Sequence, residues 1–109
     1  MTKINVIVDE HNIHFECKGH SGYANVGADI VCSGISTLTF SFFALCMDLD
    51  EEHVVIIDNV DMEDGYASID VFDSMGVLSC PLRMLRIGLE SIAEQHPENV
   101  RIKWGRNEN

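Results

Sequence analysis

Positive charge is scarce in this sequence. Only 7 lysines and arginines accompany 18 aspartates and glutamates, which leaves a formal net charge of -11. Proteins that contact nucleic-acid phosphates directly need a basic face, so the composition argues against direct nucleic-acid binding. A cationic protein partner would instead be attracted, although many acidic proteins carry such charge without any partner that uses it.

Long apolar runs, linkers, repeats and low-complexity tracts are absent as well. The first apolar run, Ile4–Val8, ends at Asp9 and is too short for a signal peptide. No stretch is expected to reach the length that crosses a bilayer. We therefore expect one domain over residues 1–109, in the cytoplasm and without membrane contact. In that reducing compartment the 4 cysteines are not expected to form disulfides.

Hydrophobic periodicity predicts elements in the order ββαββαβ. Alternating apolar residues indicate a hairpin within residues 4–18 and a second hairpin around the turn Met62–Gly65. Residues 99–104 form the last expected strand, with Val100, Ile102 and Trp104 on one face. This order predicts an α+β fold in which two helices pack on a mostly antiparallel sheet.

The first expected helix covers residues 29–49, with Asp29 as its N-cap. The second begins near Ser79, which can cap it, and has Pro81 in its first turn. One stripe of the first helix is expected to face the core: Val31, Ile35, Leu38, Phe42, Leu45 and Leu49. A second set on the far side needs cover from the other helix or from another subunit: Ser36, Phe40, Phe43 and Met47.

His11, His14, Cys17 and His20 are spaced three residues apart, as metal ligands on a helix would be. The surrounding alternation predicts a strand instead, in which neighbouring side chains point to opposite faces. Cys17 would then point to the core with Ile13, away from His14, and a tetrahedral zinc site would not form. We expect no metal site, and neither these residues nor any other motif calls for a cofactor.

Cys32 is the cysteine with a chemical context. Behind an N-cap at Asp29 it would occupy the third helical position, where unpaired N–H groups and the helix dipole favour a thiolate. The N–H groups of Ser33 and Gly34 would be placed to stabilise an oxyanion. Helical spacing sets Cys32 on the flank of the core stripe, together with Ser36 and Thr39.

His20 follows the second expected strand and provides an imidazole for that thiol. Nucleophile and base would then be combined as in cysteine hydrolases. On these residues alone two interpretations stay open: Cys32 with His20 as base, or Cys32 as a small hydrophobe at a capped helix start. Asp29 is likewise either the cap or the group that orients His20.

The string Gly19-His20-Ser21, then Gly27, then Asp29-Ile30-Val31-Cys32-Ser33-Gly34-Ile35-Ser36 resembles the signature of the Prp family of ribosomal-processing cysteine proteases. The resemblance implies an endopeptidase that removes the N-terminal extension, an apolar and aromatic segment, of large-subunit ribosomal protein number twenty-seven. It implies Cys32 as nucleophile, His20 as general base and proton donor, and supporting positions at Asp29 and Ser36. It also implies a homodimer, which the second apolar stripe would suit, and a basic ribosomal protein precursor as substrate.

The segment from Ser21 to Ala28 is expected to be a loop over the cleft. Gly22 and Gly27 give it backbone freedom, and Tyr23 is placed to contact substrate. It is either a flexible lid that orders on binding or an ordinary exposed loop. A competing function of another class also stays open: an acidic, non-enzymatic ribosome-associated binding protein.

Overall fold

The computed structural model describes residues 1–19 and 26–106, with residues 26–29 described by their backbone alone. Its elements follow the predicted order ββαββαβ. They are β1 (Thr2–Asp9), β2 (Asn12–Lys18), α1 (Val26–Glu51), β3 (Ile56–Glu63), β4 (Tyr66–Phe72), α2 (Ser79–Gln95) and β5 (Val100–Arg106).

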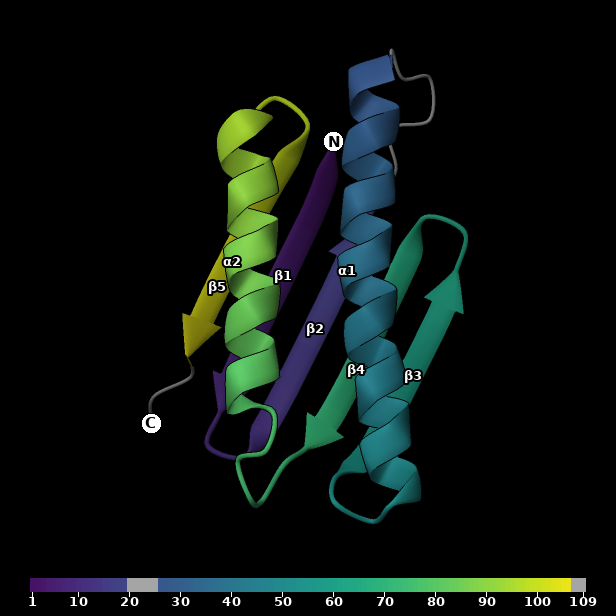
Figure 1. Ribbon diagram of the computed structural model, residues 1–109, viewed down its shortest axis with the longest axis vertical. Helices are drawn as coiled ribbons and strands as arrows, with labels where there is room; N and C mark the ends of the chain where they lie inside the picture. The colour runs from purple at the N-terminus through teal and green to yellow at the C-terminus, as the bar shows by residue number, and fades with distance from the viewer. Residues whose placement is uncertain (20–25, 107–109) are drawn as a thin grey trace.

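The strands form one five-stranded sheet in the order β3-β4-β2-β1-β5. All neighbours are antiparallel except β1 and β5, which run parallel. Both helices lie side by side on the same face of the sheet, α1 toward β4 and β3 and α2 toward β1 and β5 (Figure 1). The predicted α+β architecture, two helices on a mostly antiparallel sheet, is confirmed.

The core fills the space between sheet and helices because alternate strand residues point to the helix side. Phe15 of β2 is fully buried, and its ring lies edge-on to Phe43 with centroids 5.7 Å apart. Phe43 is only 1% exposed and is covered by the sheet, so its assignment to the far side of the helix, to be covered by the other helix or another subunit, was wrong. Two other members of that set, Phe40 and Met47, are exposed and are not covered by α2.

The two helices approach closely where each carries a glycine. A Cβ on Gly88 of α2 would lie 2.9 Å from the Leu38 side chain, and one on Gly34 of α1 would lie 3.1 Å from Ile92. Larger residues at these points would push the helices apart, and the sheet below would lose part of its cover.

Both helix starts differ from the expectation. Helix α1 begins at Val26, so Asp29 lies inside its first turn instead of capping it, and Gly27 and Ala28 are helical, not part of a loop. Helix α2 begins at Ser79 behind Leu78, with no side-chain cap at that position. The buried carboxylate of Asp73 accepts hydrogen bonds from the N–H groups of Val77 and Leu78 at 3.0 and 2.9 Å. Both donors precede the first residue of α2, so Asp73, the residue after β4, caps the turn that leads into the helix, and the helix cap expected from Ser79 is absent.

Helix α1 also corrects the expectation about apolar length. Its residues Ile30–Glu51 are long and apolar enough to cross a membrane, by length and composition alone. Core helices of water-soluble proteins meet the same criterion, and α1 packs Phe42, Phe43 and Cys46 into the core. Only 33% of this segment is buried within the chain, which leaves apolar surface on its outer sides.

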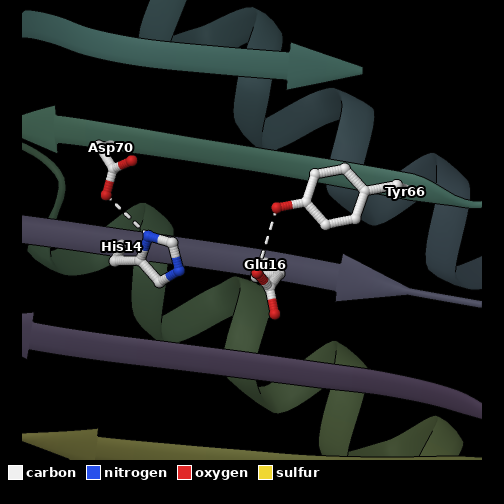
Figure 2. A network of polar contacts seen from close by, with 4 residues as sticks. All are labelled: His14, Glu16, Tyr66 and Asp70. Carbon is white, nitrogen blue, oxygen red and sulfur yellow. Dashed lines mark hydrogen bonds and ion pairs between the residues drawn. The ribbon is translucent and has the colours of Figure 1, made fainter. Parts of the chain in front are cut away.

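The opposite face of the sheet carries polar side chains. Figure 2 shows the His14 ring against Asp70, with Nδ1 2.7 Å from the carboxylate oxygen, and Tyr66 donating to Glu16 at 3.1 Å. Cys17, by contrast, packs against the core on the helix side. His14 and Cys17 thus lie on opposite faces, as strand alternation predicts, and cannot ligate one metal ion together.

Candidate active site

A cavity of about 300 Å³ opens between the first half of α1 and the ends of β2, β3 and β4. Helix α1 contributes Cys32, Ser36 and Thr39, which recur at the four-and-three spacing of one helix flank. The prediction that these three residues share a flank is confirmed. The complete lining is Thr2, Cys17, Gly19, Cys32, Ile35, Ser36, Thr39, Phe40, Glu63, Asp64, Gly65, Tyr66 and Ala67.

Cys32 is half-buried at this cavity. It is the seventh residue of α1, because the helix begins at Val26. The unpaired N–H groups of a helix belong to its first four residues, and the dipole effect fades beyond the first turn. The expected position of Cys32 in the first turn of the helix, and the expected oxyanion donors at Ser33 and Gly34, were therefore wrong. The surroundings of Cys32 are instead those of a residue in the cavity wall.

The other cysteines have different surroundings. Burial, then the nearby Cys32, then Glu16 raise the pKa of Cys17 from 9.0 to about 11. Burial and then Asp73 raise the pKa of Cys46 from 9.0 to about 12. Both groups are therefore thiols near neutral pH. Cys80 is exposed at the start of α2, and the four sulfurs, all within the described part of the chain, form no disulfide.

Gly19 fixes the chain at the edge of the cavity. Its N–H donates to the carbonyl of Gly65 at 2.8 Å. Its φ of +91° suits glycine, and a Cβ there would lie 2.6 Å from the carbonyl oxygen of Met1. Gly19 directly precedes His20, so the last described residue before the predicted base lines the same cavity as Cys32.

The remaining predicted site residues divide into two groups. His20, Ser21, Gly22 and Tyr23 lie outside the described residues, so the Cys32–His20 pair and the substrate loop stay predictions. Gly27 and Asp29 lie in the first turn of α1, Asp29 three residues before Cys32. Ser36 is exposed and lines the cavity one turn beyond Cys32.

Two features of the cavity were not anticipated. Thr39 is 2% exposed, and its Oγ1 has no hydrogen-bond partner among the described residues. An unpaired buried hydroxyl destabilises a fold by about 1–3 kcal/mol. Thr39 therefore lines the cavity at a cost to the stability of the fold. The second feature is the β3–β4 turn, whose Glu63 and Asp64 reach the cavity from a distant part of the sequence. Only the pairing of β2 with β4 brings this turn to Gly19 and Cys32.

Comparison with known proteins places these features in context. The sequence model of the family described as cysteine protease Prp matches residues 1–101. Two curated relatives, the ribosomal processing cysteine protease Prp of Staphylococcus aureus strains Mu50 and NCTC 8325, are each 29% identical over 87 residues. These alignments cover 79% of this chain and 80% of each relative.

Solved structures share the fold. Prp from S. aureus in complex with a substrate peptide superposes with a TM-score of 0.75 at 20% identity, over 95% of this chain and 99% of that one. The same enzyme with a covalently linked product peptide gives 0.74 at 21% identity, with the same coverage. The protein SMU.848 from Streptococcus mutans gives 0.68 at 23% identity, over 98% and 96%.

Proposed function

The chain belongs to the Prp family of cysteine proteases, and we propose that Cys32 is its nucleophile and His20 its general base and proton donor. The proposed substrate is the precursor of large-subunit ribosomal protein number twenty-seven, from which the enzyme removes the N-terminal extension in the cytoplasm. The observation that carries the assignment is the cavity shared by Cys32 and Gly19, the residue that directly precedes His20.

The proposed reaction follows the ordinary course of a cysteine protease. The Cys32 sulfur attacks the scissile carbonyl, His20 takes the thiol proton and gives it to the departing amine, and water then hydrolyses the thioester. The S. aureus relative, with its covalently linked product peptide, supports a covalent intermediate here. Ser36, one turn from Cys32 on the cavity wall, is proposed to contact the bound peptide. Asp29 is proposed to have a supporting role in the site from the first turn of α1.

Charge supports a basic substrate. A chain with a net charge of -11 attracts a cationic ribosomal protein at long range. The S. aureus relatives are named for ribosomal processing, which favours the same substrate class. Since the family consists of cysteine proteases, the alternative of a non-enzymatic ribosome-associated protein is set aside.

The homodimer is proposed to form through the outer face of the helix layer. Met84 and Ile87 of α2 are 72% and 60% exposed, beside an apolar groove of about 140 Å³ that Leu38 and Leu45 of α1 help to line. The charges there are mixed, because Arg86 pairs with Glu90 at 2.8 Å, so two copies can meet without strong repulsion. Sequence analysis suggested that Phe40 and Met47 would suit a dimer interface. They lie on the other flank of α1, where acidic residues gather.

Replacing the nucleophile tests the assignment. Cys32→Ser is expected to lower kcat for an internally quenched peptide spanning the junction of the extension on the order of 10³-fold or more. The fold should be retained, because Ser differs from Cys by one atom at a half-buried site. Cys80→Ser, at an exposed cysteine, is the matched control and should cleave normally. A folded Cys32→Ser enzyme with ordinary turnover would refute the proposal.

A further inference from the structure

An exposed apolar surface continues from the cavity onto the edge strand β3. Phe40, a cavity wall residue, is 49% exposed, and Met47 lies seven residues further along the same helix face, 43% exposed. Val60 and Met62 of β3 are 39% and 49% exposed. Met62 is paired with Ala67, which itself lines the cavity, so the surface is contiguous with the site. Below, these four residues are called the β3 flank.

The β3 flank is on the helix side of the sheet but lies beyond the cover of the helices. Val60 and Met62 are paired with Ile69 and Ala67, whose side chains are in the core. Figure 1 shows β3 as the outermost strand, next to α1 but with only β4 as a strand neighbour. Exposed apolar surface of this kind, rimmed by polar residues, marks an interaction site.

Carboxylates lie beside the β3 flank and behind it. Asp64 follows Met62 in the β3–β4 turn and Asp48 adjoins Met47, whereas Asp58, Asp61 and Glu63 alternate with the apolar residues of β3 and therefore lie on the opposite face of this edge strand. The sequence has no lysine or arginine between Lys18 and Arg83. Among the described residues, none of these five carboxylates has an ion pair. Two copies of such a surface would repel each other, whereas a cationic polypeptide with apolar anchors would complement it.

We propose that the β3 flank is an exosite that docks the basic body of the substrate protein, beyond the peptide held at Cys32. This inference rests on the proposed function and extends it, because it assigns a second contact between enzyme and substrate. Apolar side chains of the substrate rest on Met62, Val60 and Met47, while its lysines and arginines contact Asp48 and Asp64 and reach around the free edge of β3 to the carboxylates on its other face. Phe40 joins this surface to the cavity, so that the docked protein delivers its extension to the nucleophile.

Two substrates separate docking from chemistry: the complete ribosomal protein precursor and the short junction peptide, which lacks the basic body. Two double variants remove the exosite without altering the cavity wall, Val60→Ser with Met62→Ser, and Asp58→Asn with Asp61→Asn. Each is expected to lower kcat/KM for the complete precursor about 10-fold, through KM, and to leave the short peptide within about 2-fold of wild type. Thermal unfolding verifies that the variants are folded.

Matched controls carry the same chemical changes elsewhere. Met75→Ser removes a methionine that is 70% exposed, against 49% for Met62, and Glu10→Gln removes a charge at the β1–β2 turn, beyond the far end of β1. Both should cleave the two substrates as wild type does, apart from a small loss with the precursor for the charge control that vanishes at high salt. This small, salt-dependent loss reflects long-range electrostatic steering and not docking.

Three results would overturn the exosite. The first is that the flank variants slow both substrates equally, and the second is that they slow neither. The third is a changed sedimentation coefficient of the enzyme alone, which would show that the surface binds a second copy of the chain. Cleavage of neither substrate by the wild-type enzyme would instead refute the proposed function. The two failures are therefore distinguishable.

Discussion

Four cysteines of identical chemistry are separated by their surroundings. Cys46 is fully buried, Cys80 is exposed, and Cys17 and Cys32 share one cavity. The flank occupied by Cys32, Ser36 and Thr39 was predictable because helical spacing is a local property of the sequence. The position of Cys32 within the helix was not, because the start of α1 is set by more than the capping preference of Asp29.

Thiol reactivity follows from these surroundings. A rise in pKa from 9.0 to about 11 lowers the thiolate fraction of Cys17 near neutral pH about 100-fold. Iodoacetamide at pH 8 is therefore expected to modify Cys17 and the buried Cys46 at least about 100-fold faster in urea than in the folded protein. Peptide mapping by mass spectrometry measures both rates. Equal rates in the two states would show that burial does not protect these thiols.

The same shifts set the alkaline limit of stability. The unfolded chain releases these thiol protons near pH 9, whereas the folded protein holds them until about pH 11 and about pH 12. The folded state thus binds more protons in this window, and its stability falls as the pH rises through it.

At the level of whole elements, the turn into helix α2 shows how a cap is supplied from a distance. Sequence reasoning looked for a hydroxyl at the helix start and chose Ser79, whereas the 5% exposed Asp73, directly after β4, accepts hydrogen bonds from the two residues that precede the helix. Helical periodicity located both helices, but their ends depend on such contacts. The burial of Phe43 beside the exposed Phe40 has the same origin, because Phe15 of β2 selects which ring is covered.

Removing that cap should destabilise the protein. Asp73→Ala leaves the N–H groups of Val77 and Leu78 without their acceptor in a buried setting, and is expected to lower the free energy of unfolding by about 1–3 kcal/mol. Asp58→Ala, at an exposed aspartate of β3, is the control and should change stability by less than about 0.5 kcal/mol. Urea titrations followed by circular dichroism make the comparison. Equal stability of the two variants would contradict the capping role.

For the molecule as a whole, the sheet order decides which residues line the candidate active-site cavity. Local patterns predicted each strand and hairpin, but not that β2 would lie between β1 and β4. That pairing brings Gly65 to Gly19 and sets the acidic turn beside Cys32. Thr39 was predicted on the flank of Cys32, whereas Glu63 and Asp64 were missed as site residues because only long-range contacts place them there.

The proposed dimer also concerns the molecule as a whole. Met84→Glu with Ile87→Glu puts charges on the outer face of α2, and is expected to convert a dimer into a folded monomer in sedimentation velocity. Met47→Glu, on the opposite flank of α1, should leave the dimer intact. A wild-type protein that sediments as a monomer, or a dimer dissociated by Met47→Glu alone, would contradict the assigned face.

The central claim is that Cys32 attacks the substrate carbonyl within the cavity, and covalent capture measures this directly. A junction peptide in which a vinyl sulfone replaces the scissile carbonyl is incubated with the native protein, and the adduct is located by intact mass and tandem mass spectrometry. If Cys32 is the nucleophile, a single adduct on Cys32 is expected, formed in step with the loss of activity and blocked by excess substrate peptide. Loss of activity with the adduct on Cys80, Cys17 or Cys46 and Cys32 unmodified would contradict it.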